Sequence, residues 1–376
     1  MNSVLFVDDE PSILDGLRRV LHPMRRDWDM RFVTSGEDAL QVLSEGRIDV
    51  LVSDMRMPVM DGAELFRQVQ ERFPSTIRII LSGQSHASAA RRTIDVSHQF
   101  LTKPCDPVAL RDALGKTALL DARFGADNRV RDMVAIMTVL PVVGANGDGL
   151  RECVDANNPT IDKLTRIADV DIAMTAKLLQ LSNAALFGSE GSVFTAREAM
   201  TQLGPEAIPT VAKLLDASDE RYGEKPELAR RLREVTEYSV KVARVAERLM
   251  PDTAGGAAAY TAGLLHRIGT VVLAARAAAA LDDVTVGCAV TGTSNGEIGA
   301  GLLSLWGLPE SIVDAVGRHN DNAVLTETSH GLTTAVYIAA KIVRSSRSDH
   351  PSAALDPEWI QSLGLTDRLA AAIKAL

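Results

Sequence analysis

The chain has 376 residues, 46% of them hydrophobic and 24% charged, a composition that excludes a disordered or fibrous protein. Its length exceeds what one hydrophobic core usually holds, so we expect two or three domains. The net charge of −9 argues against a broad nucleic-acid surface, because such binding needs Lys and Arg to neutralise phosphates. Three scattered cysteines, Cys105, Cys153 and Cys288, favour reduced thiols over a disulfide framework or a zinc knuckle.

Neither a secretory signal nor a membrane anchor is predicted. The apolar run at residues 4–7 ends directly in acidic residues and lacks the basic region and longer apolar region of a signal peptide. The most apolar later stretch, residues 261–281, contains His266, Arg267 and Arg276, which are costly to place in a bilayer. We therefore expect that stretch to be a buried helix and the protein to be cytoplasmic, with no membrane partner.

Over the first 120 residues, short β-branched apolar segments alternate with helical patterns. The strand candidates are residues 4–7, 30–33, 50–52, 77–81 and 100–101. This alternation predicts a doubly wound α/β fold with a parallel five-stranded sheet, because right-handed crossovers place helices on both sheet faces. In such sheets, ligands bind beyond the carboxyl ends of the strands.

Polar residues follow four of these strands. Asp8 and Asp9 follow the first strand, Asp54 the third, Ser82 the fourth and Lys103 the fifth. Three carboxylates at one sheet edge repel one another unless a hard divalent cation lies among them. Mg²⁺ prefers such oxygen ligands and keeps some of its waters. The pattern therefore predicts a magnesium site whose shell a phosphoryl oxygen can complete.

Four segments of this region closely resemble the signature of the receiver domains of two-component response regulators, which have a flavodoxin-like fold. They read VDDE at residues 7–10, SDMRMPVMDG at 53–62, LSGQ at 81–84 and LTKP at 101–104. Their agreement in order and spacing favours a working receiver over a receiver fold that has lost its function. The resemblance covers about the first third of the chain and implies that a sensor histidine kinase or phosphotransfer protein phosphorylates Asp54.

The resemblance also assigns roles to neighbouring residues. Asp9, Asp54 and the backbone carbonyl of Arg56 would hold Mg²⁺, and Asp8 would contact the metal through its waters. Lys103 would pair with the phosphoryl group. This chemistry consists mainly of positioning and electrostatic stabilisation.

A conformational switch is the second implication of the resemblance. The Ser82 hydroxyl would move to hydrogen-bond a phosphoryl oxygen, and Phe100 would turn inward to fill the vacated space. Gln84 lies near the phosphate in this family and tunes its hydrolysis. Phe100 keeps the aromatic role of the switch position without the hydroxyl of a tyrosine.

Three histidines of this first region, His22, His86 and His98, lack ligand spacing to one another. We expect exposed or half-buried side chains rather than a metal site.

The sequence favours a stiff junction between the domains. Residues 107–120 predict an amphipathic final receiver helix, and the apolar pattern continues without a Gly-Ser linker. The glycine-rich residues 144–149 predict the first clear loop. We expect a receiver domain at residues 1–122, a helical linker at 123–140 and an all-helical output domain at 141–376.

Beyond Pro141, helical periodicity dominates and predicts an all-α domain, with a helix start near Asp169 and Asp171 and a stop at Gly188. Several segments resemble the HDOD family, a helical output domain related to the HD hydrolases. They are LP at 140–141, IADVDIAMTAKLLQLSNAALFG at 167–188, AMTQLG at 199–204, GLLHRIG at 263–269, GEIGA at 296–300, LWGLP at 305–309 and RHN at 318–320. GLLHRIG is similar to the HD motif itself.

In catalytic HD phosphohydrolases, His and Asp residues hold divalent metals that activate water. Only His266 and His319 of that set remain here. Arg267 stands where the catalytic family has the Asp of its His-Asp pair. Tyr238 or Ser239 stands where an earlier His is expected, Asn295 replaces another His, and Asn320 replaces the second residue of a His-His pair. Two imidazoles beside a guanidinium make a poor metal site, so we expect buried structural histidines, no cofactor and no hydrolysis.

The leading hypothesis is a response regulator whose phosphorylated receiver changes homodimerisation, or frees a surface of a non-catalytic HDOD domain for an unknown downstream protein. The alternative is a degenerate HD-type metal phosphodiesterase acting on a cyclic dinucleotide. Its Gly-Tyr-Pro signature is absent, but stoichiometric metal that is lost in His266→Ala would favour it. A third hypothesis, nucleic-acid control through basic residues, is weaker because Glu residues interleave with them. Those residues are Arg230, Arg231, Arg233, Lys241 and Arg244.

Overall fold

The computed structural model describes residues 2–83, 91–124, 128–155, 160–187, 192–223, 225–279, 294–327, 330–346 and 355–375. The chain divides into two compact units. The first comprises Met1–Val139, Gln180–Gly191 and Leu305–Gly307, and the second comprises Leu140–Leu179, Ser192–Ser304 and Leu308–Leu376. Gln84, His86, Gly188 and Cys288 lie outside the described residues. Cys105 and Cys153 are free thiols.

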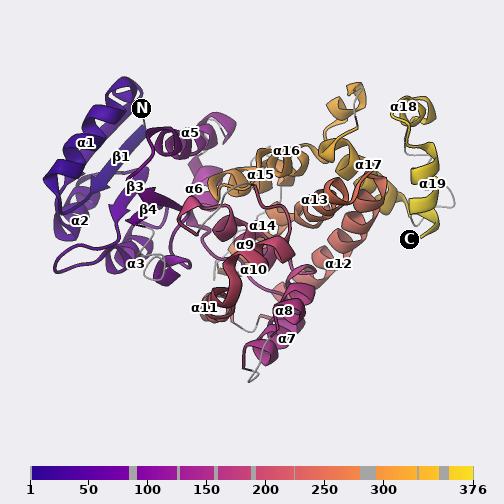
Figure 1. The fold of residues 1–376 in the computed structure, drawn as a ribbon, viewed down its shortest axis with the longest axis horizontal. Helices are drawn as coiled ribbons and strands as arrows, with labels where there is room; N and C mark the ends of the chain where they lie inside the picture. Colours follow the sequence, from indigo (N-terminus) through magenta and orange to yellow (C-terminus); the bar gives the residue numbers. More distant parts are fainter. Residues whose placement is uncertain are drawn as a thin grey trace. The chain divides into compact units, whose positions relative to one another are not determined.

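The first unit is built on a parallel five-stranded sheet in the order β2-β1-β3-β4-β5, which confirms the expected doubly wound fold (Figure 1). The strands are β1 (Asn2–Val7), β2 (Trp28–Val33), β3 (Val50–Asp54), β4 (Ile77–Gly83) and β5 (Gln99–Lys103). The central strands are largely buried and mostly apolar because helices cover both of their faces. The register pairs Val7 with Ser53 and Asp54 with Leu81, so the carboxyl ends of β1, β3 and β4 meet at one edge.

Helices flank this sheet, with α1 contacting α5 and α2 contacting α3 (Figure 1). They are α1 (Pro11–Leu21), α2 (Gly36–Glu45), α3 (Gly62–Arg72) and α5 (Pro107–Phe124), with the 3-10 helices η1 (His22–Met24) and η3 (Arg91–Thr93). Side-chain caps fix two of the helix starts. Ser35 accepts a hydrogen bond from the Asp38 N–H, and Asp61 accepts one from the Glu64 N–H, satisfying amides that the helix leaves unpaired.

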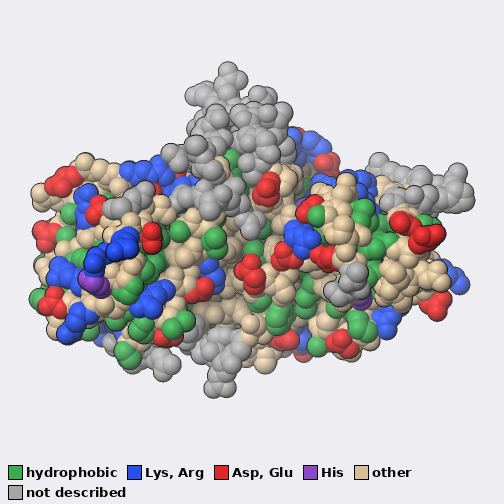
Figure 2. All heavy atoms as spheres, turned by 90° about the horizontal axis from the view of Figure 1, so that it is seen from above, with side chains coloured by type: hydrophobic (Ala, Val, Ile, Leu, Met, Phe, Trp, Pro, Cys, Tyr) green, Lys and Arg blue, Asp and Glu red, His purple; other side chains and the backbone are tan. Residues whose placement is uncertain are grey.

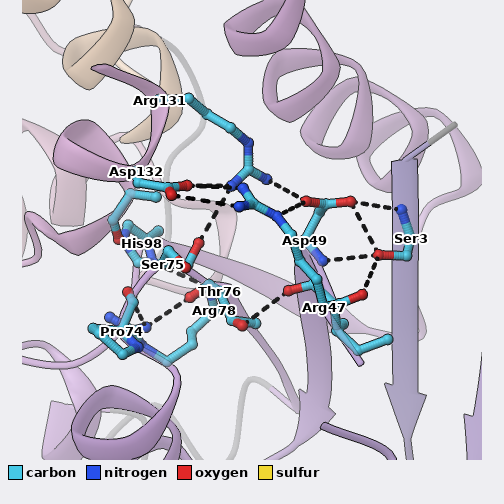
Figure 3. Close-up of polar contacts among 12 residues, drawn as sticks. Ser3, Arg47, Asp49, Pro74, Ser75, Thr76, Arg78, His98, Arg131 and Asp132 are labelled. Atoms are coloured by element: carbon cyan, nitrogen blue, oxygen red, sulfur yellow. Dashed lines mark hydrogen bonds and ion pairs between the residues drawn. The ribbon is translucent and has the colours of Figure 1, made fainter. Parts of the chain in front are cut away.

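Helix α6 (Asn128–Ile136) is held near the amino ends of β1 and β3, where Ser3 and Asp49 lie (Figure 3). Arg131 is only 2% exposed, and its guanidinium pairs with Asp49 Oδ1 at 3.1 Å. Asp49, just before β3, also accepts a 2.9 Å hydrogen bond from the Ser3 N–H. Burial acts to raise the pKa of Asp49, but the hydrogen bonds of Ser3 and the charge of Arg131 outweigh it and lower that pKa. The helix is therefore fastened by a buried ion pair.

His98 forms a second fastening of α6 and corrects an expectation. It is fully buried rather than exposed or half-buried. Its Nδ1 accepts the N–H of Arg78 at 3.0 Å, and its Nε2 lies 2.7 Å from the carbonyl oxygen of Ala135, to which it donates (Figure 3). The partner on α6 is remote in sequence, so no local pattern signals this burial. His22 is exposed, as expected.

The second unit contains α-helices and no strand among its described residues. They are α7 (Gly144–Asp155), α8 (Ile161–Ala168), α9 (Ile172–Ser182, whose last residues belong to the first unit), α10 (Ala196–Leu203), α11 (Ala207–Tyr222), α12 (Pro226–Leu249), α13 (Thr253–Leu265), α14 (Ile268–Ala279), α15 (Asn295–Leu305), α16 (Glu310–Arg318), α17 (Leu332–Ser345), α18 (Pro357–Ser362) and α19 (Thr366–Lys374). Short 3-10 helices are η4 (Ala185–Phe187, in the first unit), η5 (Gly204–Glu206) and η7 (Asn322–Thr326). This confirms the expected all-α domain.

The core of the second unit forms where α12 packs against α13 and α17. Gly263 allows a close approach, because a side chain there would come within 2.7 Å of the Ala243 Cα. The helical stretch Thr253–Ala278 is long and apolar enough to cross a membrane, yet 78% of its apolar window is buried inside the protein. This matches the expected buried helix.

The predicted loop at residues 144–149 is wrong, because these residues begin helix α7. Asp171 provides the reason. Its carboxylate accepts the N–H of Val143 at 3.0 Å and the side-chain amide of Asn146 at 3.2 Å. It also caps α9 by accepting the Met174 N–H at 2.9 Å, which confirms the expected helix start there. A tertiary acceptor thus overrides the loop tendency of the glycines.

Charged side chains on the surface form local pairs. Arg230 bridges Glu227 at 2.6 Å and Glu234 at 2.5 Å along the exposed face of α12. Figure 2 shows acidic and basic side chains interspersed on the face that it displays. These pairs support a solvated helix face rather than a nucleic-acid surface.

Arg131→Ala should destabilise the first unit by about 2 kcal/mol, because it removes the ion pair that joins the half-buried Asp49 to α6 and leaves that carboxylate with Arg47 alone of these two guanidinium partners. The measurement is the urea midpoint at which β1 and β3 lose amide-exchange protection. Arg31→Ala, which breaks an exposed pair with Asp29, should change stability by less than about 0.5 kcal/mol. Equal effects of the two substitutions would contradict the assignment.

Candidate functional site

Three charged side chains meet at the carboxyl edge of the sheet. The Lys103 ammonium donates to Asp8 Oδ2 at 2.6 Å and forms an ion pair with Asp54 Oδ1 at 2.6 Å. Asp8 is 1% exposed and Asp54 is 7% exposed. The ends of β1, β3 and β5 carry them, so residues separated by up to 95 positions share one point. The sequence predicted this convergence.

The shared cation sets the electrostatics of this cluster. Burial raises the pKa of Asp8, and the hydrogen bonds that it accepts from Lys103 and from the Glu10 N–H only partly oppose that effect. Burial acts to lower the pKa of Lys103, but the hydrogen bonds to Asp54 and Asp8 outweigh it and raise that pKa. Lys103 therefore remains an ammonium at neutral pH and offsets the repulsion between the two carboxylates.

The turn after β3 holds the Asp54 carboxylate in place. The Arg56 N–H donates to Asp54 Oδ2 at 2.9 Å. The Gly62 N–H donates to the Met55 carbonyl at 3.0 Å, and a side chain at Gly62 would collide with the Asp54 carbonyl oxygen. Val59, 97% exposed, has a φ of 66°, a strained conformation for a β-branched residue. The sequence reasoning missed Gly62, although an Asp-Gly pair at a helix start is a signal of a tight approach.

Of the remaining predicted residues, Asp9 and Ser82 lie at the carboxyl ends of their strands, whereas Phe100 lies earlier on β5. Asp9 is half-buried and has no hydrogen-bond or ion-pair partner for its side chain among the described residues. Ser82 is 1% exposed, and within the described part of the chain its hydroxyl finds no hydrogen-bond partner. Phe100 is buried at 2% exposure. Leaving a buried hydroxyl without a partner costs about 1–3 kcal/mol, so Ser82 offers an available hydrogen-bonding group at the carboxyl end of β4 among the described residues.

The donor set fits Mg²⁺. Asp54 offers a buried carboxylate, and Asp9 offers a half-buried one that no protein group occupies among the described residues. No group of three or more His, Cys, Asp or Glu side chains in the described part of the chain could hold a metal by itself. A cation here would therefore need backbone carbonyl oxygen and water as well, which is how Mg²⁺ commonly binds to one or two carboxylates.

His266 and His319, the two histidines that match the HD-type metal ligands, are buried and hydrogen-bonded, as expected. His266 Nδ1 lies 2.6 Å from the Gly263 carbonyl oxygen, and His319 Nδ1 lies 2.7 Å from that of Val316. The imidazole rings meet edge to face, with their centroids 5.0 Å apart. Asn320 contacts His319 Nε2 through its side-chain amide at 2.9 Å.

Burial and neighbouring positive charge keep this pair neutral. Burial is the main cause that places the pKa of His266 well below its ordinary value, and His319 and Arg267 add to it. Burial also lowers the pKa of His319. The Arg267 guanidinium lies 4.5 Å from the centre of the Tyr238 ring, so an aromatic face engages it rather than an acid.

Comparisons with known proteins divide the chain at the same region as the fold. Residues 4–115 match the response regulator receiver domain, and residues 140–322 match the HDOD domain. The transcriptional regulatory protein GlrR of Escherichia coli (strain K12) is 35% identical over 143 residues, covering 37% of this chain and 31% of GlrR. The sensor kinase CckA of Brucella abortus (strain 2308) is 35% identical over 105 residues, covering 27% of this chain and 11% of CckA.

Among solved structures, the signal receiver domain of an HD domain-containing protein from Pseudomonas fluorescens Pf-5 has 30% sequence identity and a TM-score of 0.29. The match covers 31% of this chain and 85% of that one. The chain spans less than a third of the length of either curated relative, so only the domains are compared and not whole proteins.

Gly62→Ala should displace the turn that holds Asp54 and destabilise the first unit by about 1–3 kcal/mol, because its Cβ would overlap backbone atoms. Gly16→Ala is the matched control. Gly16 lies inside α1 with no neighbouring atom within 4 Å of the point that a Cβ would occupy, so alanine should stabilise the helix by up to about 1 kcal/mol. Urea unfolding followed by hydrogen exchange of β3 checks both signs, and two stabilising substitutions would refute the close approach.

Proposed function

The chain carries a response regulator receiver domain followed by an HDOD domain, and on that premise we propose that it is a response regulator of a two-component phosphorelay. Asp54 would accept the phosphoryl group of a sensor histidine kinase or phosphotransfer protein. The single observation that carries this proposal is the Lys103 ammonium held between the buried carboxylates of Asp8 and Asp54. Such a cation is placed to balance the negative charge that a phosphoryl group adds.

In the proposed reaction, a carboxylate oxygen of Asp54 attacks phosphorus and forms an acyl phosphate as the bond from phosphorus to the donor nitrogen breaks. The nitrogen leaves with the electron pair, and its ring accepts a proton. Lys103 would pair with the transferred group, and the unpartnered Ser82 hydroxyl would donate to one of its oxygens. Mg²⁺, held by Asp9, Asp54 and the Arg56 carbonyl with Asp8 acting through water, would supply further neutralising charge.

The output in this proposal is binding rather than turnover. Two neutral buried imidazoles bonded to backbone carbonyls beside a guanidinium support the absence of a hydrolytic metal centre at His266 and His319. The HDOD domain would then act through a protein partner or a homodimer, in the cytoplasm.

The proposed division is a receiver at residues 1–122, a helical linker at 123–140 and an output domain at 141–376. Among the described residues of this linker, α5 ends at Phe124 and α6 spans Asn128–Ile136, which supports its helical character.

Asp54→Asn should abolish labelling by acetyl phosphate in the presence of Mg²⁺, because the amide lacks the nucleophilic oxygen charge. Intact-protein mass spectrometry measures the phosphoryl adduct. Asp61→Asn is the matched control: it makes the same change at the half-buried cap of α3, where Asn caps about as well, and should leave the yield unchanged. A wild-type yield in Asp54→Asn would sink the proposal.

Lys103→Ala should retain labelling of Asp54 but lose most of the conformational response to it, because no cation would then link β5 to the phosphoryl group. Hydrogen exchange of β4 and β5 with and without beryllofluoride measures this response. Lys116→Ala, which removes a lysine of α5 that pairs with Asp112, serves as the control. A full response in Lys103→Ala would contradict the assigned role.

A further inference from the structure

Two short segments from later in the chain belong to the first compact unit and cover its edge strand β5. We name residues 180–187 and 305–307 the β5 cap. Helix η4 of the cap contacts β5 directly. An uncovered edge strand offers unpaired backbone groups to other chains, so such strands are usually protected. Here residues of the β5 cap, from the same chain, lie against the edge strand β5.

Buried side-chain amides join the cap to the strand. Gln180 Nε2 donates to the His98 carbonyl at 2.6 Å, and Gln99 Nε2 donates to the Leu305 carbonyl at 2.8 Å. Gln180 is 2% exposed and Gln99 is 8% exposed. The Trp306 indole N–H donates to the Met137 carbonyl at 3.1 Å. The cap is therefore bound by specific hydrogen bonds and not by apolar contact alone.

The aromatic contact of the cap falls on Phe100. The rings of Phe100 and Phe187 meet edge to face with centroids 5.3 Å apart. The Arg91 guanidinium lies 5.6 Å from the centre of the Phe187 ring. Phe187 is half-buried, whereas Phe100 is almost fully buried. The cap thus contributes to the burial of the aromatic residue of the proposed switch.

The register of the sheet connects this contact to the phosphoacceptor edge. Ser82 of β4 lies beside Thr102 of β5, and Ile80 lies beside Phe100. Residues two apart on a strand share a face, so Ser82, Thr102, Ile80 and Phe100 lie on one face of the sheet. A cavity of about 160 Å³ adjoins Phe100 between Leu101, Gln180 and Trp306. Space is therefore available on the cap side for side chains to rearrange.

We infer that the β5 cap is an intramolecular latch whose contact with Phe100 is strong when Asp54 is unmodified and weak when it is phosphorylated. This inference rests on the proposed function. Engagement of Ser82 by the phosphoryl group alters the face that it shares with Phe100, and loss of the Phe187 contact loosens residues 180–187. Release of the cap separates the β5 edge from residues 180–187, which lie within the region that matches the HDOD domain.

The test is hydrogen exchange of the full chain with and without beryllofluoride and Mg²⁺. Exchange of residues 180–187 should rise about two- to tenfold with beryllofluoride, the range expected for loss of one edge-to-face aromatic pair. Phe187→Ala should show the raised exchange without beryllofluoride, and Phe187→Leu, which keeps apolar volume, should show an intermediate level. Phe194→Ala removes a half-buried phenylalanine of the second unit and should behave like wild type.

Protection of residues 53–62 reports separately whether beryllofluoride occupies the Asp54 site. Protection there with unchanged exchange at residues 180–187 overturns the latch and leaves the proposed function intact. Absence of protection at residues 53–62 overturns the proposed function and the latch with it. Wild-type exchange in Phe187→Ala also overturns the latch, because the ring contact would then hold nothing.

Discussion

The Lys103 ammonium between two buried carboxylates is the interaction on which the first unit depends. Asp8 and Asp54 lie at the ends of neighbouring strands because a parallel sheet brings its carboxyl ends to one edge. Without a cation between them, two acids with so little exposure would repel one another or take up protons. The positive charge of Lys103 at the end of β5 offsets this repulsion, and it can also balance the negative charge of a further group.

The named polar side chains at the amino ends and at the carboxyl ends of the strands differ in their hydrogen bonding. At the edge where β3 begins, Asp49, Arg131 and His98 find partners within the chain, and helix α6 is fastened there (Figure 3). At the opposite edge, Ser82 keeps a buried hydroxyl without a partner in the described part of the chain. That hydroxyl can therefore take a further hydrogen-bond partner at the carboxyl ends of the strands, where the proposed phosphoryl group would lie.

The second unit, which contains most of the region that matches the HDOD domain, buries a pair of histidines in its core. The pair His266 and His319 is buried, neutral and bonded to backbone carbonyls, and Arg267 stacks on Tyr238 beside it. Cationic and aromatic groups at these positions favour packing over metal binding. This supports an output that acts by contact, with the proposed phosphoryl chemistry of the chain in the first unit.

The sequence alone determined the strand and helix alternation and the carboxylates at the strand ends, because each is a local pattern with one physical interpretation. It also predicted that Asp54 and Lys103 would lie on the same side of the sheet, since parallel strands all place their carboxyl ends there. It did not determine the burial of His98, the helix at residues 144–149 or the cover on β5. Those depend on Ala135, Asp171 and Phe187, partners remote in sequence that only tertiary folding brings into hydrogen-bond or ring contact.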